Sequence, residues 1–269
     1  MGHTRDMGQS QVHILPFLDF GIQSFLGRYA KPSSARPPTS FIDSSKVRAV
    51  WSFYGSSNKA FSPTMNYEIY VFGSICRGES TKTSDVDVLV VSSRREKSRF
   101  PIDWSVYSPE LISEYFTKGR LFAWHLHLEA KCVFCPREEP FLTKLGRPAP
   151  YSTIATDIDE LEGLLKVALN ELVDGTNNVI YELGIAYTAI RDIAMSASWS
   201  LLKVPCFSAD APFCLPIASP LPYPVYQQAK LARHASSRGA KLDFDHTNTV
   251  NAITNAPLER WVSSLRESI

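Results

Sequence analysis

Two short apolar segments joined by a polar loop constrain this chain more than any other feature. The first, NYEIYVF, ends in Gly73-Ser74, and the second, VDVLVV, follows directly after Asp85 and contains Asp87. Short apolar runs bounded by Gly and Ser are typical of buried strands. Because side chains alternate along a strand, Asp85 and Asp87 are expected to project from the same face.

The residue types in this pattern predict a site for phosphate and a divalent cation. Gly73 lets the backbone approach a bulky anion, and Ser74, at the start of a predicted helical turn, offers a hydroxyl and backbone N–H groups. Two carboxylates on one face repel each other unless a hard cation such as Mg²⁺ binds between them.

A third carboxylate, Asp103, follows in the apolar context RFPIDWSVYS, which we interpret as a third strand. An unpaired charge is unfavourable there. If the second and third strands are neighbours, three carboxylates can surround one or two magnesium ions. That arrangement is typical of in-line phosphoryl or nucleotidyl transfer.

The first half of the chain has a mixed pattern. Besides the three strands, helical spacing is present at 44–54 and in PELISEYFTKG and RLFAWHLHLEA. We expect an α/β (α+β) catalytic domain with a small mixed sheet over residues 1–145, its core at about 44–135. The Pro- and turn-rich segment 135–153 predicts a domain boundary within it.

The second half is predicted to be an all-α bundle over residues 146–269 that binds the substrate. The segment from Asn177 to Leu202 is apolar on most faces, which predicts the central helix. Other segments with helical spacing are 156–175, 224–238 and 247–266.

The order of these motifs resembles a known family. Gly73-Ser74, ten further residues, Asp85-Val86-Asp87 and the later Asp103 are similar to the signature of nucleotidyltransferases of the DNA polymerase beta superfamily. Within that superfamily, the short step to Asp103 and the helical second half look like the aminoglycoside (kanamycin-type) enzymes.

The resemblance implies roles for individual residues. Asp103 would be a further metal ligand or the general base. The Mg²⁺ ligands would be Asp85, Asp87 and Asp103, and the nucleotide would be held by Gly73, Ser74 and Ser84.

Other charged residues are candidates for the cleft between the two halves. His125 and Glu129 are four apart on one helix face, which predicts either a place in the cleft or a structural hydrogen bond. Arg191 or Lys203 could contact phosphate, and Glu182 could bind an amine or hydroxyl of the acceptor. For the charges on the apolar helix, the alternative is an internal ion-pair network, because buried charges are costly unless paired.

The charge composition limits the classes of partner that the protein can bind. The 28 Lys and Arg and 27 Asp and Glu leave a net charge of +1, which excludes a strongly basic nucleic-acid binder. The expected function is Mg²⁺-dependent transfer of a nucleoside monophosphate from an NTP, with ATP the first choice, to a hydroxyl of a small antibiotic-like or metabolite acceptor, releasing pyrophosphate. Such an enzyme could confer antibiotic resistance. The alternatives are a protein or tRNA acceptor, or a catalytically silent nucleotide-binding module.

Two further features indicate the compartment. The five cysteines are an odd number spread over the chain, unlike a disulfide framework, so reduced thiols are expected. No apolar run approaches the roughly 20 residues of a membrane helix. We therefore expect a cytoplasmic protein without a membrane partner.

Overall fold

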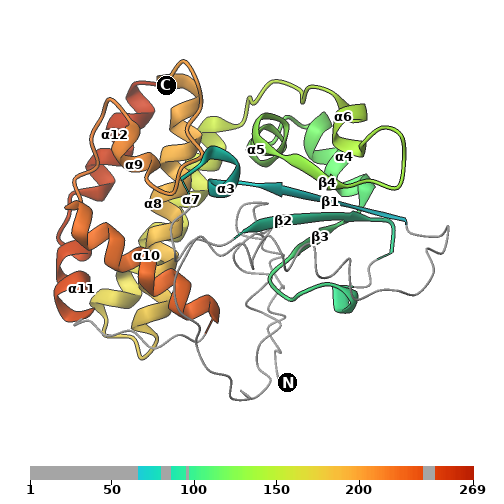
Figure 1. Ribbon diagram of the computed structural model, residues 1–269. Coiled ribbons are helices and arrows are strands. Elements are labelled where there is room, and N and C mark those ends of the chain that lie inside the picture. Colours follow the sequence, from blue (N-terminus) through green and yellow to red (C-terminus); the bar gives the residue numbers. More distant parts are fainter. Residues whose placement is uncertain (1–65, 80–85, 95–96, 239–245) are drawn as a thin grey trace, which may run out of the picture.

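The structure, a computed structural model, describes residues 66–79, 86–94, 97–238 and 246–269. Figure 1 shows a small sheet with helices packed on one of its faces and a bundle of helices beside it. This arrangement confirms the expected fold class, an α/β region followed by a largely helical region.

The sheet has four strands in the order β3-β2-β1-β4. β1 is antiparallel to β2 and β4, whereas β2 and β3 are parallel, so the sheet is mixed as expected. The strands are β1 (Tyr67–Phe72), β2 (Asp87–Ser92), β3 (Ser105–Tyr107) and β4 (Lys131–Phe134). The first two agree with the sequence prediction, and the predicted neighbours β2 and β3 do pair.

Two details of the sheet differ from the prediction. The third strand begins only at Ser105, and Asp103 lies before it in an exposed turn, in which the Trp104 N–H donates to the Pro101 carbonyl at 3.0 Å. The edge strand β4 was not predicted. Three of its four residues are exposed, so the sequence has no apolar alternation that would indicate a strand. Cys132 on this strand is an exposed thiol.

The two faces of β1 and β2 pack against different side chains. Tyr70, Phe72, Leu89 and Val91 face a core formed with helices α4 (Pro109–Thr117), α5 (Leu121–Glu129) and α6 (Phe141–Leu145). The alternate residues face a smaller core, whose members are Ile69, Val88, Val90, Phe100 and Trp104. The period of two along each strand therefore fixes which side chains can meet the helices.

Four short helices accompany the sheet. They are α3 (Ser74–Arg77), α4 (Pro109–Thr117), α5 (Leu121–Glu129) and α6 (Phe141–Leu145), with a 3-10 turn at Lys97–Arg99. α6 lies inside the segment predicted to be irregular. α4 begins as its sequence predicts, with Pro109 at its first position and the Ser108 hydroxyl accepting from the Leu111 N–H at 3.2 Å.

α5 belongs to both halves of the molecule. Its Phe122, Ala123 and Leu126 pack in the core of the sheet, whereas Leu121 and Trp124 pack in the core of the bundle. Most of α5 is therefore buried, and His125 and Glu129 near its C-terminal end lie where the two cores meet.

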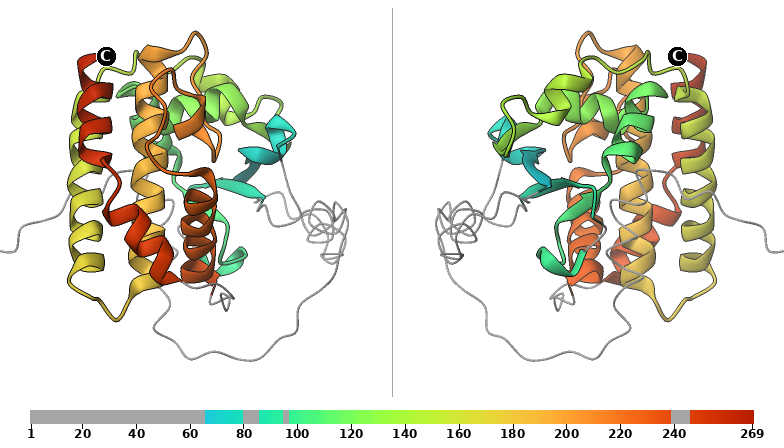
Figure 2. Two further views of the ribbon diagram at one scale, coloured as in Figure 1. Left: turned by 90° about the vertical axis from the view of Figure 1, so that its left-hand side faces the viewer. Right: turned by 90° about the vertical axis from the view of Figure 1, so that its right-hand side faces the viewer.

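The bundle is built around α8, as its apolar sequence predicted. α8 packs against α7, α9 and α10, and Figure 2 shows the long helices α7 and α8 running side by side. The bundle helices are α7 (Ile154–Val173), α8 (Val179–Leu201), α9 (Ala211–Cys214), α10 (Tyr223–Arg238), α11 (His246–Thr254) and α12 (Leu258–Glu267). The helical segment expected at 247–266 is broken at Pro257, the residue that precedes α12.

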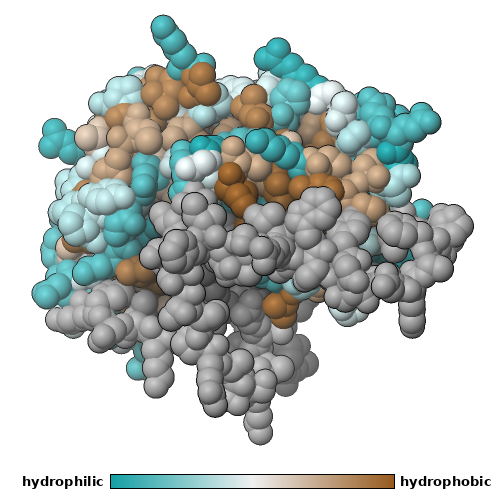
Figure 3. Space-filling model, viewed as in Figure 1, coloured by the Kyte–Doolittle hydropathy of each residue, from teal (hydrophilic) through white to brown (hydrophobic). Residues whose placement is uncertain are grey.

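The predicted helix at 44–54 lies outside the described residues, and the domain boundary near residue 145 stays a prediction. On the face shown in Figure 3, apolar residues gather near its centre, around the position of α3 in Figure 1, between areas of hydrophilic residues. Among the described residues, no helix is both long and apolar enough to cross a membrane.

A buried carboxylate attaches the segment before α6 to the sheet. Glu68 on β1 is fully buried and accepts hydrogen bonds from the Tyr70 hydroxyl, from Arg137 Nε at 3.0 Å and from the Phe141 N–H at 2.7 Å. Each of these donors would lose its acceptor if the carboxylate were removed.

We expect Glu68→Ala to lower the free energy of unfolding by about 3 kcal/mol, since the buried Tyr70 hydroxyl and the partly buried Phe141 N–H are left without this acceptor. Urea denaturation would measure this change, with Glu139→Ala, at an exposed position nearby, as the control. A loss below about 1 kcal/mol would contradict the role given to Glu68.

Candidate functional site

Gly73 and Asp87 come into close contact where β1 ends and β2 begins. Gly73 has φ 74° and ψ −149°, a backbone conformation that is essentially restricted to glycine. Its neighbour Phe72 pairs with Asp87 across the two strands. A Cβ atom at Gly73 would lie 2.1 Å from Oδ2 of Asp87, so both the conformation and the contact require glycine.

The half-buried Asp87 carboxylate points to the side of the sheet that carries α5, because it shares a strand face with Leu89 and Val91. Burial raises the pKa of this carboxyl to about 6, although the positive charges of Arg191 and Arg77 oppose the shift. The negative charge of Glu129 adds to it. Both positive and negative side chains therefore act on the Asp87 carboxylate.

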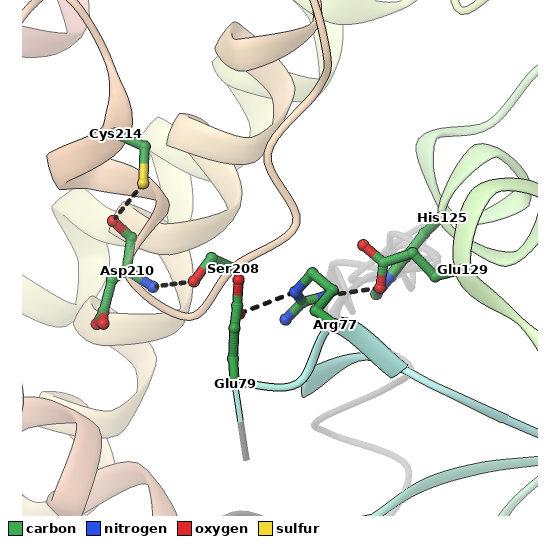
Figure 4. Close-up of polar contacts among 7 residues, drawn as sticks. All are labelled: Arg77, Glu79, His125, Glu129, Ser208, Asp210 and Cys214. Atoms are coloured by element: carbon green, nitrogen blue, oxygen red, sulfur yellow. Dashed lines mark hydrogen bonds and ion pairs between the residues drawn. The ribbon is translucent and has the colours of Figure 1, made fainter. Parts of the chain in front are cut away.

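Glu129, the last residue of α5, is the carboxylate on that side. Its Oε2 accepts from Arg77 Nη1 at 2.5 Å and contacts His125 Nε2 at 2.9 Å, as Figure 4 shows. Arg77, at the end of α3, also pairs with Glu79 at 2.9 Å. Burial alone would raise the pKa of Glu129, but the hydrogen bond from His125 and the charge of Arg77 outweigh it and lower the pKa.

The bundle contributes a group of charges from α8 and α10. Arg191 Nε donates to Oδ1 of the fully buried Asp192 at 2.6 Å, and its guanidinium lies 5.7 Å from the ring centre of Tyr187. Burial opposes the cation, yet the charge of Asp192 raises the pKa of Arg191. Burial and the charge of Arg191 lower the pKa of Arg233 on α10.

One buried oxygen in this group lacks a partner within the described part of the chain, Oδ2 of Asp192. The charges of Arg191 and Arg233 both act on the single carboxylate of Asp192, so the group formed by these three residues has a net positive charge. Arg191 also lowers the pKa of Asp87. The positive charge of the bundle therefore acts on the same carboxylate as Arg77 of α3 and Glu129 of α5.

The structure thus brings together some of the residues predicted from the sequence. Gly73, Ser74 and Asp87 lie at the β1–α3 turn, with Glu129, His125 and Arg191 around them. The hydrogen bond expected between His125 and Glu129 is present. The functional roles of all these residues stay predictions.

Other predicted residues lie elsewhere. Glu182 is in the first turn of α8, about 13 Å along the helix from Arg191, and burial together with the charge of Glu171 raises its pKa. Lys203 is exposed beyond the end of α8, and Asp103 is exposed in its turn. Ser84 and Asp85 lie outside the described residues.

The sequence analysis missed Arg77 and Arg233. Arg77 falls in the polar stretch between Gly73-Ser74 and the aspartates, and nothing in its spacing signals a partner 52 residues away. Arg233 lies on a helix whose position relative to α8 only the packing determines.

The described residues do not hold three metal-ligating side chains close enough together for a metal ion. Asp87 does supply a hard oxygen donor of the kind that Mg²⁺ prefers, held in place by its contact with Gly73. The donor set fits a magnesium ion if a second carboxylate joins it.

Comparisons with known proteins agree with this geometry. A family model described as a nucleotidyltransferase domain matches residues 56–131, the part that contains β1, α3, β2, α5 and Glu129. A nucleotidyltransferase-like protein from Exiguobacterium sibiricum, known from its crystal structure, is 13% identical over 82% of this chain and 74% of that one, with a TM-score of 0.28. That superposition is too loose to support an argument. No curated protein matches the chain.

Residues 56–131 therefore match a nucleotidyltransferase domain, which supports nucleotidyl transfer as the general reaction. The domain model covers the elements that place Asp87 beside Gly73 and Glu129, so the site built from the geometry and the matched domain coincide.

A substitution that adds a Cβ atom at Gly73 tests the contact with Asp87. We expect Gly73→Ala to lower the free energy of unfolding by more than 2 kcal/mol, or to displace Asp87 and abolish nucleotide binding, because strain and clash add. Gly78→Ala is the control, since Gly78 also has φ 74° but a Cβ there meets nothing within 4 Å. Equal effects of the two substitutions would show that the contact with Asp87 has no consequence.

A histidine beside the arginines predicts how stability depends on pH. Burial, with the charges of Lys230 and Arg233, lowers the pKa of His234 to about 4, whereas an unfolded histidine titrates near pH 6.5. Between these values only the unfolded chain binds the proton, so the free energy of unfolding falls as the pH is lowered, by at most about 3.4 kcal/mol.

We expect His234→Gln to flatten this dependence between pH 6.5 and pH 4, as measured by urea denaturation at several pH values. His246→Gln, at an exposed position, should keep the wild-type slope. An unchanged slope in His234→Gln would refute the assignment.

Proposed function

We propose that this nucleotidyltransferase transfers a nucleoside monophosphate from an NTP, with ATP the first choice, to a hydroxyl of a small molecule in a Mg²⁺-dependent reaction. Pyrophosphate is the other product. The position of Asp87 carries the proposal, because this carboxylate lies against Gly73 at the start of α3 and interacts with the charges of both Glu129 and Arg191.

The phosphates of the nucleotide would bind between α3 and the bundle. Ser74 begins α3, where the first backbone N–H groups of a helix have no partner within the helix and suit an anion. On the opposite side, Arg191 and Arg233 provide two guanidinium groups against the single carboxylate of Asp192. A polyphosphate would balance this surplus of buried positive charge.

Asp87 and Asp85 are the residues proposed to hold Mg²⁺. A cation near Asp87 would offset the repulsion between its carboxylate and that of Glu129, which otherwise adds to the raised pKa of Asp87. When bound, the ion would neutralise charge that develops on the triphosphate during an in-line displacement.

We assign the general base to Glu129. Its lowered pKa keeps the carboxylate ionised at neutral pH, and its Oε1 accepts no hydrogen bond from the described residues. This oxygen can take the proton of the acceptor hydroxyl while the hydroxyl oxygen bonds to the α-phosphorus and the bond to pyrophosphate breaks. Asp103, the base suggested by the sequence resemblance, is the alternative.

A small acceptor is favoured over a polyanion. The net charge of +1 provides no general attraction for tRNA, and the resemblance to kanamycin-type enzymes favours a hydroxyl-bearing antibiotic or metabolite. Antibiotic resistance would follow if the modified molecule were an aminoglycoside.

Label transfer tests the proposal directly. The protein would be incubated with each α-labelled NTP and Mg²⁺, in separate reactions with aminoglycosides, total tRNA and cell protein. We expect label on a small molecule, strongest with ATP and absent when EDTA removes the metal. Label on RNA or protein would establish the alternative acceptors, and nucleotide binding without transfer to any pool would indicate a silent module.

Substitutions then separate the roles of the acidic residues. We expect Asp87→Asn to abolish most transfer, and Glu129→Gln to lower the transfer rate roughly 100- to 10,000-fold while sparing nucleotide affinity. Asp103→Asn is expected to stay within a few-fold of wild type. Single-turnover transfer and nucleotide titration measure these effects, and the reverse ranking of Glu129 and Asp103 would return the base to Asp103.

A further inference from the structure

His125 connects the bundle to the carboxylate of Glu129. Its ring stacks on Phe207, with 4.4 Å between ring centres and 6° between planes. Phe207 is buried in the segment between α8 and α9 and belongs to the core of the bundle. At the edge of the imidazole, Nε2 contacts Glu129 at 2.9 Å. A single side chain therefore touches both the bundle and the proposed base.

The imidazole is held on two sides. Phe72, the residue before Gly73, meets it edge to face with 5.3 Å between ring centres, while Phe207 covers its face. The side chain of His125 is 12% exposed. Aromatic contacts at two angles leave the ring little freedom to rotate, so its hydrogen-bonding nitrogen has a fixed direction.

The surroundings favour a neutral imidazole. Burial lowers the pKa of His125, and the charges of Arg77 on α3 and Arg191 on α8 act in the same direction, whereas Glu129 opposes them. A neutral ring has one N–H, and its contact with a carboxylate assigns that proton to Nε2. His125 can therefore hold Glu129 by a hydrogen bond without neutralising it.

Both donors to Glu129 make their hydrogen bonds to the same oxygen. Arg77 and His125 contact Oε2, which leaves Oε1 for the acceptor hydroxyl. A carboxylate fixed by two hydrogen bonds from different elements keeps one orientation, and a general base depends on such orientation because proton transfer needs hydrogen-bond contact.

We propose that His125 is a positioning residue for nucleotidyl transfer, which orients Glu129 and makes that orientation depend on how Phe207 and the α8–α9 segment pack. The proposal rests on Glu129 being the general base. Because the α8–α9 segment belongs to the bundle, a change in its packing would reach Glu129 through this ring without any contact with the nucleotide.

The test compares His125→Phe with His125→Gln. Phenylalanine retains the contacts with both aromatic rings but cannot donate, so we expect kcat to fall roughly 10- to 100-fold with the nucleotide KM nearly unchanged. Glutamine retains an N–H donor and should recover much of the rate. His127→Phe is the matched control on the same helix, since His127 is exposed and its ring contacts Trp124.

Two further readouts separate positioning from general structural damage. Without the hydrogen bond from His125, the pKa of Glu129 should rise, which would move the acidic limb of the rate profile to higher pH. Carbon-13 NMR of labelled glutamates would follow the same titration without any acceptor, with Glu129 assigned by its loss in Glu129→Gln. Phe207→Leu should lower kcat and leave nucleotide affinity intact.

These outcomes also separate this inference from the proposed function. Wild-type activity in Glu129→Gln would overturn the base and, with it, the role of His125. A loss of activity in Glu129→Gln, together with wild-type kcat and an unchanged Glu129 titration in a folded His125→Phe, would overturn the positioning role alone.

Discussion

The contact between the Asp87 carboxylate and the backbone of Gly73 is the constraint on which the rest of the site depends. Gly73 follows β1 and Asp87 begins β2, so the pairing of the two strands brings these residues together. Because Gly73 has no Cβ, the carboxylate can lie against the turn that starts α3. A phosphate group at α3 and a cation at Asp87 would then be neighbours. Any larger residue would separate the two halves of the site.

α5 determines which carboxylate joins Asp87. The helix is buried on one side in the core of the sheet and on another in the core of the bundle, so its position is fixed by two sets of apolar contacts. Its C-terminal turn carries His125 and Glu129 into the space where the cores meet. The geometry of the proposed base therefore depends on the packing of both regions, which is consistent with a chain in which the bundle influences chemistry at the sheet.

Charges of opposite sign lie where the sheet and the bundle meet. The negative charges of Asp87 and Glu129 repel each other where β2 begins. On the facing helices of the bundle, the group formed by Arg191, Arg233 and Asp192 has an excess of positive charge. Each group is buried enough for these charges to act strongly over short distances. A bound metal ion and polyphosphate would satisfy both sides at once.

The sequence by itself determined the local features. The apolar runs, the Gly73-Ser74 turn and the uniformly apolar segment of α8 predicted two strands, the short helix and the central helix, because each signal arises from neighbouring residues. The proposal that Glu129 is the third carboxylate of the site required the tertiary structure. Asp103 sits among apolar residues in the sequence but lies in an exposed turn, whereas Glu129, 42 positions after Asp87, reaches the site because α5 packs between two cores. Contacts such as Arg77 with Glu129 and His125 with Phe207 join residues far apart in the chain, and only the packing of the folded molecule decides them.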